Sequence, residues 1–301
     1  MSRPHAPTVC AVIVTHNRCE LLAESLKSVL RQGRPPDAVL VVDNASDDGT
    51  SELLRLRFPE VEVLRLEQNQ GGAGGFHEGI RRGHRDGYDY LWLMDDDTIP
   101  RDDALEKLLA AVEEAPNAQL VVSKVVWTDG EMHPMNRPFL RWGAVESMVR
   151  MAESGGGLIP LRAATFVSLL LARAAVDRYD LPEKRYFIWS DDIEYTARIL
   201  RHNTGYVATR SVAVHKTRSP HTAVNSGERF YFHVRNSIYM FRGPAWSARE
   251  KVSLIWQYLR SILIFLRHER FSGGALRVVA RGWSDSVREP ADPAGPYLRP
   301  G

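Results

Sequence analysis

Cysteine is scarce in this chain, which has only Cys10 and Cys19 in 301 residues. The two are not spaced as a CxxC redox motif or as the paired cysteines of a zinc site. Cys10 also lies in an apolar run that we expect to be buried. The cysteines therefore indicate no redox or zinc site, and a reducing cytoplasm is the simplest compartment.

Long apolar runs and an excess of charge are also lacking. The first apolar run, residues 9–14, is too short for the core of a signal peptide, so we expect nothing to direct the chain for export. The 39 Lys and Arg nearly balance the 37 Asp and Glu, which gives a formal net charge of +2. That charge provides no broad basic field, and we expect no nucleic-acid partner. A hydrophobic content of 44% indicates a folded protein with a large core.

Apolar patterns of two kinds alternate over the first hundred residues. Segments between the short apolar runs carry apolar residues at helical spacing, as at Leu22, Leu26 and Val29. This alternation predicts an α/β fold with a mainly parallel, Rossmann-like sheet and helices on both faces. In such sheets ligands bind beyond the carboxyl ends of the strands. The short runs that we expect to be strands are residues 9–14, 39–42, 61–66 and 90–94.

Each of these predicted strands ends in polar residues, and the fourth ends in Asp95, Asp96 and Asp97. Three adjacent carboxylates repel one another and lose hydration on burial unless a cation neutralises them. A hard divalent cation such as Mg²⁺ or Mn²⁺ does so and leaves positions open for substrate phosphates. The alternative is a solvated turn or a helix N-cap, with a helix that begins at residues 98–100. The triplet alone does not decide between the two.

A glycine cluster at residues 71–75 follows the third predicted strand. A dinucleotide fingerprint would require glycine at His77, and a P-loop would require lysine at Ile80, so both motifs are excluded. Close approach of the backbone to a ligand, packing of a helix on the sheet, or an ordinary glycine-rich turn remain. Asn69 is available to bind a sugar or a base.

Five motifs taken together resemble the family 2 glycosyltransferases, which have the GT-A fold. They are VIVTHNR at 12–18, VVDNASDDGT at 41–50, NQGGAGGF at 69–76, WLMDDD at 92–97 and WSDDIE at 189–194. Their order and spacing make the resemblance specific, and it covers roughly residues 8–243. It implies a metal-dependent enzyme that transfers a sugar from a nucleotide-sugar donor.

The resemblance also implies roles for particular residues. Asp95 and Asp97 would hold Mn²⁺ or Mg²⁺, and His215 would complete the metal site unless it is an ordinary loop or core histidine. The residues implied to bind the nucleotide sugar are Thr15, Arg18, Asp43, Asn69, Gly72, Asp95 and Asp96. For Asp47 and Asp48 we expect turn or helix-cap roles.

Inversion at the anomeric carbon requires a carboxylate that takes the proton of the acceptor hydroxyl. Asp192 is the first candidate by motif position and Asp191 the second, and a helix N-terminus would favour their ionised forms. The resemblance assigns Trp189 and Glu194 to acceptor binding. Capping of the helix by Ser190 or Asp191 is the alternative for one of these side chains.

Within the family, the motifs look most like those of bacterial galactofuranosyltransferases and rhamnosyltransferases of the cell envelope. We expect UDP-galactofuranose as donor, with dTDP-rhamnose as the alternative, and a polyprenyl-diphosphate-linked glycan as acceptor. Two readings of another class are a nucleotide-sugar-binding protein without catalysis and a nucleotidyltransferase. The first predicts loss of metal or base carboxylates, which are all present. The second usually has a glycine-rich loop with Arg and Lys after its first strand, where this chain has THNR.

The composition changes near residue 246. We expect a catalytic domain at 1–245, a helical extension at 246–288 and a disordered tail at 289–301. The apolar stretch 252–267 contains Arg260 and is shorter than the roughly 20 residues that span a bilayer. It would lie on a membrane surface, on the catalytic domain or on a second subunit. We expect a cytoplasmic protein, peripheral on the inner face of the plasma membrane, and the oligomeric state stays open.

Overall fold

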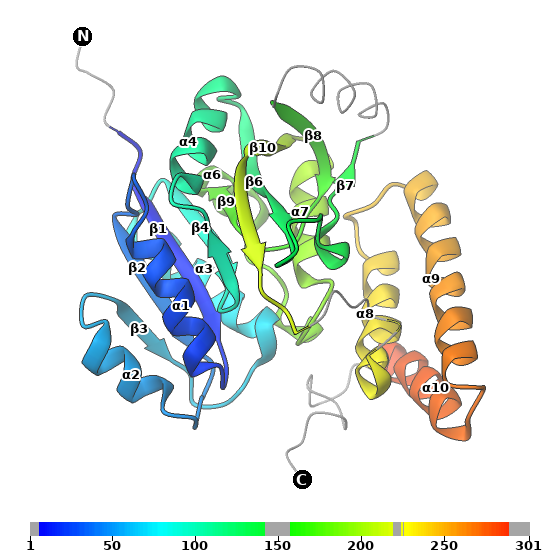
Figure 1. Cartoon of the computed structure of the whole chain (residues 1–301). Helices are drawn as coiled ribbons and strands as arrows, with labels where there is room; N and C mark the ends of the chain where they lie inside the picture. The colour runs from blue at the N-terminus through cyan, green and yellow to red at the C-terminus, as the bar shows by residue number, and fades with distance from the viewer. Residues whose placement is uncertain (1–5, 142–156, 219–223, 225, 289–301) are drawn as a thin grey trace.

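The centre of the molecule is a mixed β-sheet, which Figure 1 shows in the computed structural model from the strand β3 at one end to β7 at the other. The structure describes residues 6–141, 157–218, 224 and 226–288, and within them ten strands form the sheet in the order β3-β2-β1-β4-β9-β6-β10-β8-β7, with β5 paired to β10. Strands β3, β2, β1 and β4 are parallel, and β9 runs antiparallel between β4 and β6. The predicted tail at 289–301 lies outside the described residues.

The first four strands fall where the apolar runs predict them, and six more strand segments follow them in the chain. Their bounds are β1 Val9–Thr15, β2 Ala38–Asp43, β3 Glu62–Arg65, β4 Tyr90–Asp95, β5 Thr98–Pro100, β6 Ala118–Val126, β7 Phe139–Leu140, β8 Leu158–Ala163, β9 Leu169–Ala172 and β10 Thr204–His215. Residues 98–100 therefore form a strand, not the start of a helix. This pairing of β5 with β10 places His215 opposite Thr98, beside the aspartate triplet.

Helices cover both faces because β1 alternates its side chains between two cores. Val9, Ala11 and Ile13 face α1 (Cys19–Leu30), α2 (Thr50–Arg57) and α4 (Ala104–Glu114). Cys10, Val12 and Val14 face α3 (Gly71–Asp86), α6 (Arg173–Tyr179) and α7 (Asp191–Leu200). Burial raises the pKa of the Cys10 thiol to about 12, as suits an inert core residue.

Helix α3 lies unusually close to the sheet because glycines recur on its inner side. A Cβ at Gly75 or Gly79 would lie 2.4 Å from a methyl carbon of Val14 or Val12, and one at Gly83 would lie 2.5 Å from Leu91. No side chain fits at these distances. Packing on the sheet thus accounts for much of the glycine-rich sequence.

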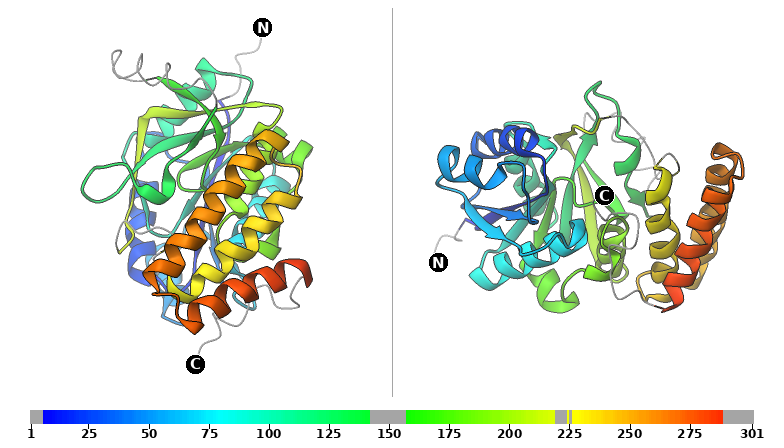
Figure 2. Two further views of the ribbon diagram at one scale, coloured as in Figure 1. Left: turned by 90° about the vertical axis from the view of Figure 1, so that its right-hand side faces the viewer. Right: turned by 90° about the horizontal axis from the view of Figure 1, so that it is seen from below.

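Three helices form a separate layer at the end of the sheet opposite β3, as Figures 1 and 2 show. They are α8 (Phe230–Arg242), α9 (Ala248–His268) and α10 (Gly273–Arg288). Phe230 of α8 stacks on Phe265 of α9 at 4.0 Å between ring centroids, and α10 contributes Ala275 and Val278 to the same core. Among the described residues, no helix has both the length and the apolar composition needed to cross a membrane.

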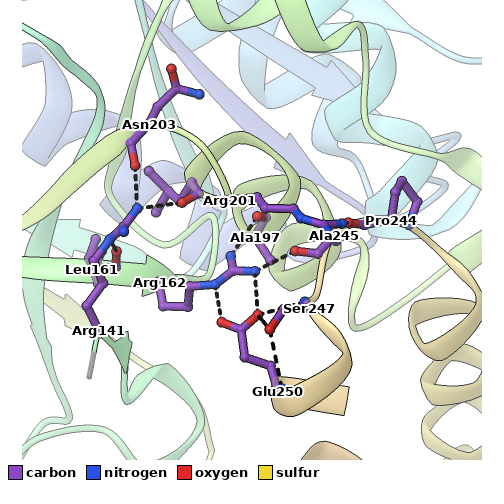
Figure 3. Close-up of polar contacts among 11 residues, drawn as sticks. Arg141, Leu161, Arg162, Ala197, Arg201, Asn203, Pro244, Ala245, Ser247 and Glu250 are labelled. Carbon is purple, nitrogen blue, oxygen red and sulfur yellow. Dashed lines mark hydrogen bonds and ion pairs between the residues drawn. The ribbon is translucent and has the colours of Figure 1, made fainter.

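A buried arginine joins this helical layer to the sheet (Figure 3). Arg162 of β8 donates from Nε to Glu250 of α9 at 2.5 Å, from Nη1 to the Ala197 carbonyl of α7 at 2.6 Å, and from Nη2 to the Ala245 carbonyl. Glu250 also accepts from the backbone N–H of Ser247 at 2.7 Å in a capping box that begins α9. The network fixes the position at which α9 leaves the sheet.

Candidate active site

The polar motifs meet at one edge of the sheet because their strands are neighbours in parallel register. Thr15 of β1 pairs with Asp43 of β2, and Val14 pairs with Asp95 of β4. The Asn44 side chain extends this edge to the glycine segment, since it accepts from Gln70 N–H at 2.8 Å and donates to the Gly71 carbonyl at 2.7 Å. The predicted convergence of strand ends is confirmed.

Asp95, Asp97 and His215 form a cluster in which one ligand atom from each lies within 4.8 Å of the others. His215 Nδ1 is 2.7 Å from Asn136 Oδ1, and the Asn136 amide nitrogen donates to Thr165 at 2.9 Å. Asn136 Oδ1 can only accept, so His215 Nδ1 carries the hydrogen. In the neutral ring, Nε2 then directs its lone pair toward Asp97, whose Oδ1 is 3.0 Å away.

This arrangement fits a divalent cation. Within the described part of the chain, Asp97 Oδ1 is buried and accepts no hydrogen bond. An imidazole lone pair that faces a carboxylate oxygen at 3.0 Å is unfavourable unless a proton or a metal ion lies between them. Two carboxylates and an imidazole are a suitable ligand set for Mn²⁺ and leave open positions for a diphosphate. The sequence prediction of these three residues agrees with the geometry.

The charges of the cluster are strongly perturbed. Burial and the Asp97 charge raise the pKa of Asp95 to about 7. Burial acts to raise the pKa of Asp97, but the neighbouring His215 and Arg18 side chains lower it to about 2. Burial opposes a rise in the pKa of His215, yet Asp97 and Asp95 raise it. The negative charge in this pocket thus exceeds what the protein itself neutralises.

Thr15 and Arg18 hold the middle of the aspartate triplet. Thr15 Oγ1 donates to Asp96 Oδ2 at 2.8 Å, and Arg18 Nη1 lies 3.3 Å from Asp96 Oδ1 and also pairs with Asp97. Burial raises the pKa of Asp96 to about 6 although Arg18 and the Thr15 hydrogen bond oppose that rise. Arg18 is half exposed, so the remaining donors of its guanidinium are open to a phosphate.

The other predicted donor residues lie along the same edge. Asp43 is fully buried, accepts from Ser46 N–H at 2.9 Å and Ser51 Oγ at 3.1 Å, and pairs with Arg65. Asn69 is exposed, and its Oδ1 accepts from Gly71 N–H at 2.8 Å. Gly72 faces open space, since a Cβ there would meet no atom within 4 Å. Asp48, in contrast, accepts from Cys19 N–H at 2.9 Å and acts at the start of a helix, as predicted.

The two candidate base carboxylates begin α7 and lie near enough to the metal cluster for the Asp95 charge to raise the pKa of both. Burial, with the Asp95 charge, raises the pKa of Asp192 to about 7 although backbone N–H groups of Ile193 and Phe166 oppose that rise. Burial and the Asp192 charge raise the pKa of Asp191 well above its usual range. Burial therefore outweighs the expected effect of the helix terminus, and Asp192 titrates near neutral pH, where a general base is most effective.

The two predicted acceptor residues lie on either side of this pair. Trp189 is half-buried and has a left-handed backbone with φ of 63°, and Ser190 has φ of 70° with no side-chain cap bond. Glu194 is buried and pairs with Arg198, with Oε1 3.1 Å from Nε. Its carboxylate is thus engaged within α7, whereas Trp189 lies in the turn that leads to Asp191 and Asp192.

Sequence reasoning missed several residues that shape the site. Asn136 orients His215 from a 3₁₀ turn at Pro134–Asn136, far from it in the chain, and no local pattern signals the contact. Arg65 pairs with Asp43 because β3 is the neighbour of β2. Arg235 and Asn236 are fully buried polar residues in an aromatic helix, and that combination could have drawn attention to them.

Comparisons with known proteins agree with this geometry. The family model described as glycosyl transferase family 2 matches residues 10–168. Galactofuranosyltransferase GlfT1 of Mycolicibacterium smegmatis is 35% identical over 202 residues, 65% of this chain and 67% of the relative. GlfT1 of Mycobacterium tuberculosis is 34% identical over 200 residues, 64% of this chain and 65% of the relative. The chain therefore spans about two thirds of the length of these relatives.

A solved structure shows the same fold at low identity. S. aureus TarS 1-349 in complex with UDP-GlcNAc matches with a TM-score of 0.63 and 15% identity, over 93% of this chain and 81% of that one. The sheet, its flanking helices and the carboxylates at its edge define a glycosyltransferase of the GT-A fold. Because the family match spans more than half of the sequence, the chain belongs to glycosyl transferase family 2, whose members invert the anomeric carbon. The predicted fold and family are confirmed.

Proposed function

We propose that this chain transfers galactofuranose from UDP-galactofuranose to a glycan acceptor, with inversion and with the help of a divalent metal ion. The observation that carries the proposal is the cluster of Asp95, Asp97 and His215 at one edge of the sheet, with Asp192 near enough for the Asp95 charge to raise its pKa. The similarity to two galactofuranosyltransferases supports the choice of donor. The matched region covers about two thirds of each of these relatives.

In the proposed reaction, the acceptor hydroxyl oxygen forms a bond to the anomeric carbon while the bond from that carbon to the diphosphate breaks. The Asp192 carboxylate takes the hydroxyl proton, and the electron pair leaves with UDP. Mn²⁺ or Mg²⁺ held by Asp95, Asp97 and His215 would supply positive charge that stabilises the departing diphosphate. Arg18, with its guanidinium half exposed beside the cluster, binds phosphate oxygens.

The proposed donor contacts follow the edge of the sheet. Thr15, Asp43, Asn69 and Gly72 follow one another along this edge from β1 to the start of α3, where Gly72 faces open space. Trp189 would hold the acceptor sugar. Since Glu194 is paired with Arg198, we assign it to support the helix that carries the base, and its direct contact with an acceptor would require that pair to open.

We further propose that the enzyme works at the cytoplasmic face of an anionic membrane, where a polyprenyl-diphosphate-linked acceptor is available. Four apolar residues on one side of α9 are exposed: Val252 by 71%, Trp256 by 71%, Leu259 by 47% and Leu263 by 42%. Residues 248–288 carry eight Lys or Arg but only three Asp or Glu, a larger excess than in the whole chain. An apolar stripe within a basic layer complements an anionic lipid surface.

Vesicle sedimentation tests this location. The purified chain should sediment with phosphatidylglycerol vesicles at low salt, less so at high salt, and not with phosphatidylcholine vesicles. Replacing Val252 and Trp256 by Ser should abolish sedimentation. The alternative is that the chain sediments with neither kind of vesicle but forms dimers, and that the double variant is monomeric. That result would mean that the apolar stripe binds a second copy of the chain.

The donor is tested with a panel of nucleotide sugars. We expect slow hydrolysis of UDP-galactofuranose with Mn²⁺ or Mg²⁺, loss of hydrolysis with chelator, and weaker action on UDP-galactopyranose, UDP-glucose and dTDP-rhamnose. A preference for dTDP-rhamnose would keep the fold and the chemistry but replace the donor. Absence of metal-dependent binding to all four would contradict the assignment of the site.

A further inference from the structure

The turn that precedes the two base carboxylates has a strained backbone. Phe187, Trp189 and Ser190 have positive φ angles of 63°, 63° and 70°, in a conformation that residues with side chains seldom adopt. Ser190 directly precedes Asp191 and Asp192, so the path of this turn sets where both carboxylates point. Strained backbone of this kind persists only where the surrounding structure holds it.

Two adjacent residues of α8 hold the turn from one side. The Asn236 side-chain amide donates to the carbonyls of Tyr186 at 3.0 Å, Ile188 at 2.7 Å and Trp189 at 2.9 Å. Arg235 Nη2 donates to the Tyr186 carbonyl at 2.9 Å and the Arg185 carbonyl at 3.1 Å. A few side-chain groups thus bind most of the carbonyls between residues 185 and 189.

The two donors are themselves rigidly placed. Arg235 and Asn236 are both completely buried, and Arg235 Nε donates to Asn236 Oδ1 at 3.0 Å. The Arg235 guanidinium lies over the rings of Phe232 at 5.0 Å, Tyr231 at 5.3 Å and Tyr239 at 5.7 Å. Cation–π contacts and burial of this kind fix the direction of the donors.

The other side of the turn rests on the proposed donor segment. The Phe187 carbonyl accepts from Ala73 N–H at 3.0 Å in the first turn of α3. Gly71 has φ of +70°, and a Cβ there would lie only 2.1 Å from the Phe187 carbonyl oxygen. Glycine at 71 therefore lets the turn approach the segment that follows Asn69 and Gln70.

We propose that Arg235 and Asn236 are positioning residues that hold the turn at residues 185–190, and with it Asp191 and Asp192, against the donor segment at Gly71. This inference rests on the proposed function and deepens it. Both residues act through the backbone of the turn and need not touch a substrate. These contacts would fix the position of the base relative to the acceptor hydroxyl. They would not affect the positions of Asp95, Asp97 and His215.

The matched test is Asn236→Asp, which keeps the size of the side chain and the acceptor for Arg235 but removes the donor to the three carbonyls. We expect kcat to fall by about 10- to 100-fold, because misplacing a catalytic group by about 1 Å costs on this scale. The KM for the donor and the metal-dependent binding of UDP should stay unchanged. Ser261→Ala is the control, since it removes a 2.8 Å contact to His233 that joins α8 and α9 away from the turn.

The possible results distinguish a positioning role of Asn236 from a role in stability alone, and they also distinguish failure of this inference from failure of the proposed function. Turnover per folded molecule that is equal in wild type, Asn236→Asp and Ser261→Ala would overturn the positioning role alone. Absence of turnover in the wild type would overturn the proposed function and this inference together. If Asn236→Asp does not fold, Arg235→Lys, which removes the guanidinium donors to the Arg185 and Tyr186 carbonyls but keeps the positive charge, should lower kcat in the same way.

Discussion

The molecule contains two clusters of charge that differ in how they are neutralised. At the edge of the sheet, Asp95, Asp96, Asp191 and Asp192 all have pKa values raised by burial and by one another, with Arg18 and His215 as counter-charges. Beneath α9, Arg162 and Glu250 form a closed pair. Hydrogen bonds from Arg162 and Ser247 outweigh burial and lower the pKa of Glu250 to about 2.

The difference distinguishes a binding site from a structural contact. Every nitrogen of the Arg162 guanidinium donates to an oxygen of the chain (Figure 3). The Cζ atom of Arg162 also lies 4.4 Å from the ring centroid of Trp246. In the carboxylate cluster, the buried Asp97 Oδ1 lies 3.0 Å from His215 Nε2, a contact that is favourable only with a proton or a metal ion between the two atoms. A cluster in which the carboxylates outnumber the positive side chains is suited to a cation from outside, whereas a closed pair needs none.

Asp192→Asn should have the largest effect of the changes considered, and that effect should be on turnover and not on stability. The amide cannot accept a proton, so we expect turnover to fall by about 10²- to 10⁴-fold. Removing one charge from a crowded group of carboxylates should not lower the stability of the metal-free protein. Steady-state kinetics, calorimetric UDP binding with Mn²⁺ and thermal unfolding together check this prediction. Retained turnover would contradict the assignment of the base.

Arg162→Met should have the opposite effect and lower stability but not turnover. It leaves Glu250 without its partner and two carbonyls without donors, and we expect a loss of about 3 kcal/mol in the free energy of unfolding. Turnover per folded molecule should change little, because Arg162 contacts α7 at Ala197, more than one helical turn beyond Asp192. Urea unfolding measures the loss. A variant as stable as the wild type would show that the closed pair does not secure α9.

The carboxylate cluster could be predicted from the sequence in large part, whereas the Arg162–Glu250 pair could not, and the difference has a physical reason. The carboxylates at residues 95–97 follow a strand, and the periodicity of the chain places strand ends together, so the metal site could be predicted locally. His215 joins them only through the pairing of β5 with β10, and a family resemblance was needed to find it. Arg162 and Glu250 are 88 positions apart, and Asn236 lies some 47 positions beyond the turn it holds. Contacts of that kind depend on tertiary packing, which no local pattern encodes.

The smallest expected effect is the pH dependence of the stability that the Arg162–Glu250 pair contributes. The pKa of Glu250 is lowered from 4.5 to about 2 in the folded chain, chiefly by Arg162 and Ser247 acting against burial. A lowered pKa stabilises the fold above pH 4.5, and this contribution is lost as the pH falls toward 2. The difference in melting temperature between the wild type and Glu250→Gln should therefore be largest at pH 6 and shrink between pH 4.5 and 2. A difference that stays constant over this range would mean that Glu250 stabilises α9 by packing and capping, not by its charge.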